Sequence, residues 1–400
     1  MAVGMRGESN SACWAAVPDE LMAEILSWLS VKHLMQLRSV NKFFKTLISN
    51  PYFVQMHLNK SARTPNLALI WLDSMEDRDS HFVSKSVPRL LLHNDPSYRL
   101  INFVRISRVV GSCNGLICLI CSSYPSSFDE WLCFWNPAIR TITPEFGLFS
   151  RSSDIKFSFG YDNLNKTYKV VAFLVELEVH GTLNNMVQRT LKNMVKVFSL
   201  GDNSWRDIQC LPVIPLHWFD APNNKDVYFN GTINWLAYCN HDFYLRGIPE
   251  NYVILSLDLS TESYTQIMLP PGFDKGPNVQ ANIALLMNFL CFCRDFERNH
   301  FLIWKMKDFG VQDSWVQLFK ISYHNFYSTN AQLFHLQHLE ILPIYLSENG
   351  YTLIFTHNYN SNAPVFICDC RDDTVEPTRI SDTIGWLWAK DYIESLVPTC

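Results

Sequence analysis

The chain has 400 residues, 48% of them hydrophobic and 18% charged, which is an ordinary balance for one large folded domain and a smaller one. A formal net charge of −5, without a basic run, does not indicate a nucleic-acid partner. Residues 1–16 lack the apolar run of a signal peptide, and the longest apolar run, Ile283–Cys293, is too short to span a bilayer. We therefore expect a soluble protein of the cytoplasm or nucleus, without a membrane partner.

Residues 17–50 predict three short amphipathic helices. Pro18 suits the first helical position, and acidic residues follow it in the first turn. A second helix can be capped by Ser30, and Asn50 with Pro51 ends the third. Apolar residues recur at helical spacing in three stripes: Leu21, Met22, Ile25, Leu26 and Leu29; Leu34 and Leu37; and Val40, Phe43, Phe44, Leu47 and Ile48. Helices of this size cannot bury so much apolar surface among themselves, so the surplus must pack on the rest of the chain or on another protein.

The same stretch resembles an F-box. The matching positions are Val17-Pro18, Asp19-Glu20-Leu21, Ile25-Leu26, Leu29, Val31-Lys32-His33-Leu34, Arg38 and Val40-Asn41-Lys42-Phe43-Phe44. Val17 stands where leucine is usual and Phe44 where tryptophan is usual, and both positions remain apolar. The resemblance implies docking to the Skp-family adaptor of a cullin–RING (SCF) ubiquitin ligase. It assigns this docking to Pro18, Leu21, Ile25, Leu26, Leu29, Leu34, Val40 and Phe44, some as direct contacts and some as supports. We expect residues 1–60 to suffice for it.

After a last short helix over Pro51–Lys60, the pattern changes from about Gly111 to alternating and short apolar runs separated by turn residues. Five segments share a strand–turn–strand plan at a spacing of roughly 50 to 65 residues, near or above the period of a kelch blade. They are Leu132–Arg140, Val195–Arg206, Val253–Tyr264, Phe301–Trp315 and Val365–Asp373. Asn230-Gly231 between two apolar runs predicts a hairpin. The repeats favour a β-propeller, although a β-sandwich could give a similar strand list.

The β region also resembles the plant F-box-associated domain, a degenerate kelch-like domain of the F-box/kelch-repeat and S-locus F-box proteins. The matching phrases are Gly111–Leu116, Trp135–Arg140, Phe159–Asp162, Tyr168–Val171, Asn203–Arg206, Asn230–Trp235, Ser256–Glu262, Ile303–Met306, Ser314-Trp315 and Glu394–Leu396. We expect a mainly β protein: a small N-terminal three-helix F-box followed by a large β-propeller-like domain. The expected limits are a disordered stretch over residues 1–11, the F-box over 12–58, a connector over 59–95 and the F-box-associated domain over 96–396.

The twelve cysteines do not form a metal-ligand pattern. Cys118 and Cys121 make a lone C-x-x-C in an apolar run, and the other close pairs lie far away in sequence, whereas a structural zinc site needs four converging ligands. We interpret them as buried apolar side chains in a reducing compartment. His335 and His338 could share a helix face, but two histidines without a third ligand fit a surface pair better. No cofactor is expected.

Two classes of function remain open. The sequence contains no P-loop, G-x-G-x-x-G, H-E-x-x-H or G-x-S-x-G motif, which favours a non-catalytic substrate receptor that recruits an unidentified protein target to the ligase. An enzyme on a propeller scaffold would need titratable groups that converge in the central channel, and separated residues could still do so. An S-locus-type receptor for a pistil ribonuclease is a further alternative. We interpret the recurring Trp205, Trp235, Trp304 and Trp315 as core between repeats rather than as a ligand box.

Overall fold

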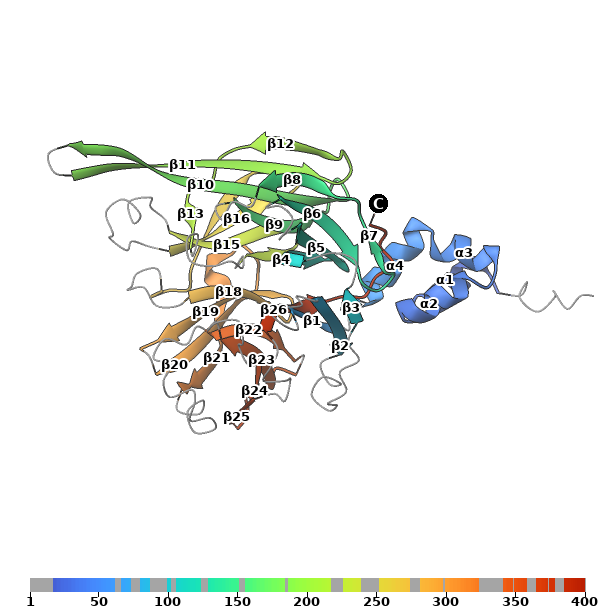
Figure 1. Cartoon of the computed structure of the whole chain (residues 1–400). Helices are drawn as coiled ribbons and strands as arrows, with labels where there is room; N and C mark the ends of the chain where they lie inside the picture. Colours follow the sequence, from blue (N-terminus) through green and yellow to red (C-terminus); the bar gives the residue numbers. More distant parts are fainter. Residues whose placement is uncertain are drawn as a thin grey trace, which may run out of the picture.

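Four helices lie at one end of a large β domain in the computed structural model of the chain (Figure 1). The structure describes residues 17–61, 66–72, 80–86, 99–101, 106–123, 129–150, 155–183, 186–216, 226–238, 252–273, 281–297, 299–323, 341–347, 349–357, 365–372, 374–377 and 385–399. The stretch expected to be disordered, residues 1–11, and the pair His335 and His338 lie outside the described residues.

The helices are α1 (Asp19–Leu26), α2 (Val31–Arg38), α3 (Lys42–Ile48) and α4 (Pro51–Ser61). The Asn41 side chain accepts a hydrogen bond from the Phe44 N–H at 2.9 Å. This cap starts α3 at Lys42, so Val40 lies in the preceding turn and not in the helix as its apolar spacing suggested. Ser30 precedes α2 but does not cap it by its side chain, because its hydroxyl contacts His33 Nδ1 at 2.8 Å.

In the described residues, the β domain forms six antiparallel sheets. The first sheet has the strand order β4 (Ile106–Cys113), β5 (Leu116–Ser122), β6 (Asp129–Asn136) and β7 (Thr141–Ile142), with β8 (Phe146–Ser150) also paired to β6. The second has the order β12 (Ser204–Ile208), β11 (Met186–Ser199), β10 (Thr167–Leu183) and β9 (Ile155–Asp162), and the third has the order β13 (Ile214–Pro215), β15 (Thr232–Tyr238), β16 (Tyr252–Asp258) and β17 (Tyr264–Met268), with β14 (Val227–Phe229) also paired to β15. The fourth has the order β18 (Ala281–Leu286), β19 (Phe289–Phe296), β20 (His300–Met306) and β21 (Trp315–Ser322), and the fifth has the order β22 (Ile341–Leu346), β23 (Thr352–His357), β24 (Val365–Asp369) and β25 (Thr374–Pro377). A short 3-10 helix, Gln312–Ser314, precedes β21.

The closing sheet joins the two ends of the β domain. It consists of β26 (Gly385–Tyr392), β1 (Asn66–Leu72), β2 (Ser80–Ser86) and β3 (Arg99–Ile101), with Leu67 opposite Asp391 where β1 meets β26. Around the ring, β4 contacts β9, β9 contacts β15, β14 and β15 contact β18, β18 contacts β22, β22 contacts β26 and β26 contacts β4. The domain is therefore a closed propeller, in which few strand edges stay exposed.

The closing sheet is where the fold differs from the sequence-based expectation. The five repeated segments each lie in one of the first five sheets, and the sixth sheet has no such segment. Residues 59–95, expected to be a connector, contain both β1 and β2. These strands belong to the ring because β26, from the far end of the sequence, pairs with β1.

The core lies between neighbouring sheets. One apolar cluster joins the β9–β12 sheet to the β13–β17 sheet around Val171 and Trp235, and another joins the β13–β17 sheet to the β18–β21 sheet around Ile254 and Trp315. Trp205 and Trp304 also pack against such clusters. The recurring tryptophans thus lie in or against the packing between blades, as interpreted from the sequence.

The two ends of the ring differ. Successive antiparallel strands turn back at alternate ends, so β4, β6, β9 and β26 all finish at the end that carries the helices, here called the helix end. Tight turns lie there, such as Asn230-Gly231, whose φ angles of +49° and +83° are those of the predicted two-residue hairpin. At the opposite, far end, the described strands β15, β17, β21, β23 and β25 finish.

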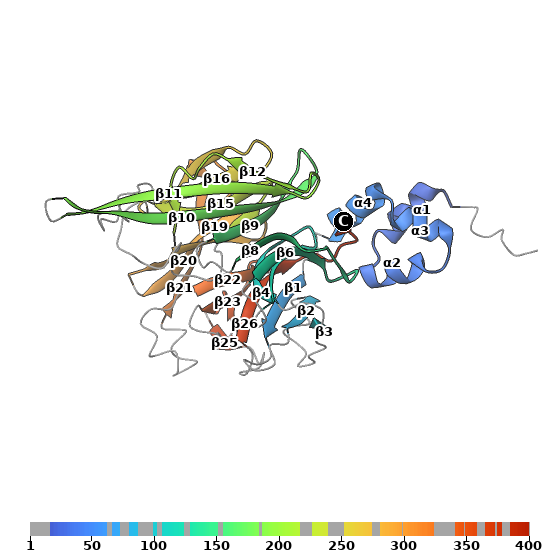
Figure 2. The same cartoon turned by 45° about the horizontal axis from the view of Figure 1, so that its top comes forward.

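One hairpin extends far beyond the others. β9 pairs with β10 only as far as Leu174, and β12 pairs with β11 only from Val195. Beyond these points β10 and β11 pair with each other up to Leu183 opposite Met186. Figure 2 shows this arm projecting past the sheets, away from the helices.

Candidate protein-docking site

An exposed apolar stripe runs along α1. Leu21, Ile25 and Trp28 follow each other at spacings of four and three residues, which places them on one face of the helix and of the turn after it. Their exposures are 55%, 60% and 62%. The opposite face of α1 carries Met22 and Leu26, which are buried in the helical core. The helix thus has one apolar face inside and one outside, and the outer face is available to another protein.

The structure separates the eight residues that the F-box resemblance assigned to adaptor docking. Exposed residues are Pro18, Leu21, Ile25 and Val40; part-buried residues are Leu29 and Phe44; and buried residues are Leu26 and Leu34. Leu34 has no exposed surface and packs in the core formed by the four helices. The buried pair can support the docking face but cannot contact a partner without unfolding of the module.

Two exposed aromatic residues of the stretch 17–50 were not among those eight. Trp28 follows α1, and the Lys60 ammonium of α4 lies 4.4 Å from the centre of its ring, a cation–π contact that fixes the indole while leaving most of it exposed. Phe43 lies in the first turn of α3, packed edge-to-face on Phe44 at 5.4 Å. The sequence signal that could have found these two residues is helical spacing, because Trp28 follows Ile25 by three residues and Phe43 follows Val40 by three.

A buried histidine joins α4 to the turn after α1. The ring Nε2 of His57 donates to the Leu29 carbonyl at 3.0 Å, which fixes the neutral tautomer with the proton on that nitrogen. Burial lowers the pKa of His57, and the hydrogen bond to Leu29 opposes this only in part. The imidazole is therefore neutral in the folded module and acts as a fixed donor between two helical segments.

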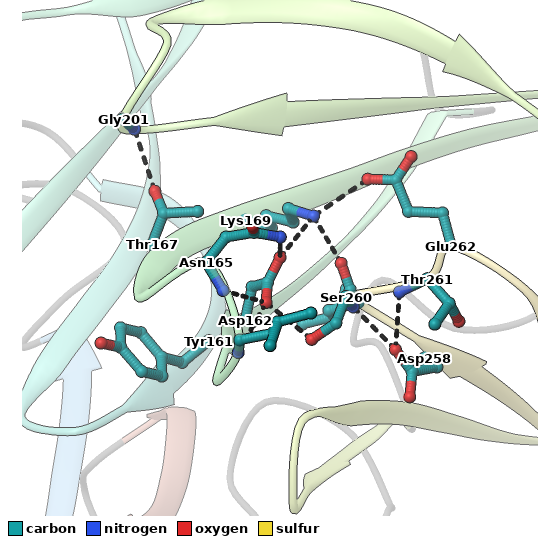
Figure 3. Close-up of polar contacts among 12 residues, drawn as sticks. Tyr161, Asp162, Asn165, Thr167, Lys169, Gly201, Asp258, Ser260, Thr261 and Glu262 are labelled. Atoms are coloured by element: carbon teal, nitrogen blue, oxygen red, sulfur yellow. Dashed lines mark hydrogen bonds and ion pairs between the residues drawn. The ribbon is translucent and has the colours of Figure 1, made fainter.

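A second organised cluster of polar residues lies at the helix end of the β domain, between the β9–β10 and β16–β17 turns (Figure 3). The Lys169 ammonium contacts the carboxylates of Asp162 at 2.7 Å and Glu262 at 3.0 Å, and donates to the Leu259 carbonyl. Arg206 donates to both carboxylate oxygens of Glu262, including the Oε1 that Lys169 contacts. Because these residues come from two neighbouring sheets, the cluster joins one blade to the next; we call it the polar junction.

Asp162 is the most enclosed member of the polar junction. It has no exposed surface, and it accepts hydrogen bonds from the Leu164 and Asn165 N–H groups at 3.0 Å and from the Ser260 hydroxyl at 2.6 Å. Burial alone would raise its pKa, but the hydrogen bonds from Asn165, Lys169 and Ser260 together hold the pKa of Asp162 well below its usual range. A fully satisfied carboxylate of this kind joins elements; it has no free lone pair directed at a substrate.

The cysteines of the C-x-x-C lie on β5 with both side chains buried. Burial raises the pKa of the Cys118 thiol well above its usual value, so the group is neutral and packs as an apolar side chain. Within the described ranges, no three His, Cys, Asp or Glu side chains are grouped so that they could hold a metal ion. The same residues include no helix with the length and apolar character needed to cross a membrane.

A helical module with an exposed apolar face, joined to a closed propeller, is a protein-interaction architecture. The model of the F-box domain matches residues 14–56, and that of the F-box associated beta propeller domain matches residues 72–399. The chain therefore belongs to the family of F-box proteins with a C-terminal F-box-associated propeller.

Similar proteins of Arabidopsis thaliana are named as F-box proteins. The F-box/kelch-repeat protein At3g23880 is 24% identical over 76% of this chain and 79% of its own length. The F-box protein CPR1 is 25% identical over 77% of this chain and 73% of its own length. The putative F-box protein At4g38870 is 26% identical over 94% of this chain and 84% of its own length.

Proposed function

We propose that this protein is the substrate-recognition subunit of an SCF ubiquitin ligase. The helices dock a Skp-family adaptor, and through it the cullin–RING ligase, while the propeller selects a protein target. The observation that carries the proposal is the exposed apolar stripe Leu21, Ile25 and Trp28 on a module of the F-box family. Exposure of an apolar face to water is unfavourable. Burial of one such side chain against a partner stabilises the complex by roughly 1.5–3 kcal/mol.

In this role the protein forms and breaks no bonds itself. Holding target and ligase in one complex converts the transfer of ubiquitin into an effectively intramolecular step, and this proximity is its contribution. The buried, mutually satisfied charges of Asp162 and Lys169 fit a structural role, because neither group is available to a substrate.

We further propose that the far end of the propeller recognises the target. The adaptor and the ligase would occupy the helix end, where the helices lie. The opposite end is where the β10–β11 hairpin projects past the sheets, away from the helices. Loops held on a rigid scaffold are where binding selectivity is usually found.

The direct test is adaptor binding by the variant Ile25→Lys. Ile25 is exposed in the last turn of α1, where a lysine is favoured by the helix dipole, so the helix should remain folded. Because the variant puts a charge where an apolar contact is expected, we expect binding to a purified Skp adaptor to weaken by at least about tenfold. Calorimetry would give the affinity, and circular dichroism would check the helices.

The matched control is Val311→Lys, which places the same charge on an exposed apolar residue of the β domain. It should bind the adaptor as the unmodified protein does. Equal adaptor affinity of Ile25→Lys and Val311→Lys would contradict the docking face, and lack of binding by the unmodified full chain would contradict the proposed function itself.

A further inference from the structure

The C-terminal tail, residues 393–399, is part of the helical module. After β26 it leaves the ring at the helix end, and Ser395, Leu396 and Thr399 are buried. Leu396, only 6% exposed, belongs to the same apolar cluster as Leu26 of α1 and Leu34 of α2. A residue near the C-terminus thus completes a core whose other buried members lie between Met22 and Phe53.

A single amide side chain fixes the path of this tail. Asn136, at the end of β6, donates through Nδ2 to the Ser395 carbonyl at 3.1 Å and to the Val397 carbonyl at 2.8 Å. Its Oδ1 accepts from the Ala138 N–H at 3.0 Å. The turn that follows brings Ala138 and Ile139 against the helical core. Asn136, fully buried, therefore orders both segments by which the propeller contacts the helices.

The tail also runs close to the β4–β5 turn. Gly115 has a φ of +82°, and a Cβ there would lie 2.7 Å from the Ile393 carbonyl oxygen. Only glycine combines that backbone conformation with so close an approach. The tail is therefore held on two sides, by Gly115 and by Asn136, before Leu396 enters the helical core.

The tail follows directly from the strand that closes the ring. β26 pairs with β1, and β1 follows α4 after only a short stretch of chain. The tail can reach the helices in this geometry only when β26 is in place beside β1. Formation of the closing sheet and completion of the helical core are thus linked through the same few residues.

We infer that Leu396 and Asn136 are positioning residues for adaptor docking, which makes docking depend on a closed propeller. This rests on the proposed function in naming the adaptor as the partner. The tail holds the packing of α1 and thereby the exposed stripe that α1 presents. An open or incomplete ring would leave the helical core without Leu396 and so would weaken docking, and residues 1–60 alone would not carry the full affinity.

The test uses full-length variants. Leu396→Ala removes most of the apolar side chain that packs in the helical core. Asn136→Asp keeps the acceptor for the Ala138 N–H but removes the donor to the tail. Both should weaken Skp-adaptor binding by about tenfold or more. The first variant leaves a cavity that destabilises the packing of a small core, and the second releases the tail that carries Leu396 into that core. Leu396→Met, which keeps the volume, should restore binding to within about threefold of the unmodified protein. Leu302→Ala, an equally buried leucine in a distant sheet, is the matched control and should not change adaptor affinity.

Hydrogen exchange distinguishes positioning from general loss of stability, and it does not depend on the adaptor. In Leu396→Ala the amides of α1–α4 should lose protection while those of β18–β25 keep it, and Leu302→Ala should show the reverse. Unchanged helix protection together with unchanged adaptor affinity in both tail variants would overturn the inference. If the unmodified protein failed to bind any adaptor, the proposed function would fall, whereas loss of helix protection in Leu396→Ala would still support the coupling of tail and helices.

Discussion

Replacing Lys169 by methionine should strongly destabilise the propeller. Lys169 and Asp162 are 3% and 0% exposed, and their charges lie 2.7 Å apart. Removing the ammonium leaves the buried Asp162 carboxylate without its cation, and loss of one partner from a buried ion pair costs about 3–5 kcal/mol. Hydrogen bonds from Leu164, Asn165 and Ser260 remain. Because these still stabilise the carboxylate, we expect about 3 kcal/mol, the lower end of that range.

A double variant tests the reason for this loss. Lys169→Met together with Asp162→Asn removes both charges, so it should be more stable than Lys169→Met alone by at least about 1 kcal/mol. The surface pair Lys196 and Asp207, 43% and 70% exposed at 3.1 Å, provides the control, because Lys196→Met should cost less than about 1 kcal/mol.

The assay is urea unfolding at pH 7, followed by tryptophan fluorescence and by circular dichroism, with coincident transitions as the check that one free energy of unfolding describes the data. If Lys169→Met were no more destabilising than Lys196→Met, the polar junction would not contribute to the free energy of unfolding of the propeller. If the double variant were no more stable than Lys169→Met, the loss would come from packing and not from an unpaired buried charge.

Two further outcomes are expected. The folded-state pKa of Asp162 is depressed, so its ionised form stabilises the protein above the unfolded pKa of about 3.9, and this contribution is lost as the pH falls toward the folded pKa. The difference in unfolding free energy between the unmodified protein and Asp162→Asn should therefore narrow between about pH 6 and pH 3. A difference that stays constant over this range would be inconsistent with the depressed pKa. In a reconstituted ubiquitination reaction with a co-purifying target, full-length Ile25→Lys should bind the target but not support its ubiquitination, and transfer at the unmodified rate would refute the receptor mechanism. This variant is a better test than deletion of the helices, which would expose Leu396.

Local pattern in the sequence predicted much of this architecture. Helical spacing and turn residues gave the four helices, and five repeated segments gave five of the six sheets. The closing sheet could not be found in this way, because β26 and β1 lie at opposite ends of the β domain and belong to no shared repeat. Pairing between ends is set by closure of the whole ring and leaves no local signal.

The docking site was predictable as a segment but not residue by residue. Two apolar series run along α1 at a spacing of four residues, one through Ile25 and one through Leu26. Spacing alone cannot show that the series with Leu26 faces inward while the series with Ile25 faces outward. That choice depends on what the helix packs against. Here the inner face belongs to an apolar cluster that also includes Leu396 and is packed against by Ile139, which no pattern within residues 17–61 could indicate. The F-box resemblance named the stretch that the F-box model matches, and the structure divides its eight predicted docking residues into exposed, part-buried and buried ones.

The phrases by which this chain resembles the F-box-associated domain share a place in the fold. All ten lie at or near strand ends at the helix end, and six of them form two groups: Gly111–Leu116, Trp135–Arg140 and Glu394–Leu396 around the tail, and Phe159–Asp162, Asn203–Arg206 and Ser256–Glu262 around the polar junction. The first group holds the helices, and the second joins two blades beside them. Under the proposed function, both jobs are the same whatever the target, because the adaptor end must be presented in one geometry. None of these phrases lies at the far end, so the features that make this chain resemble its family are separate from the end of the propeller that we propose for target selection.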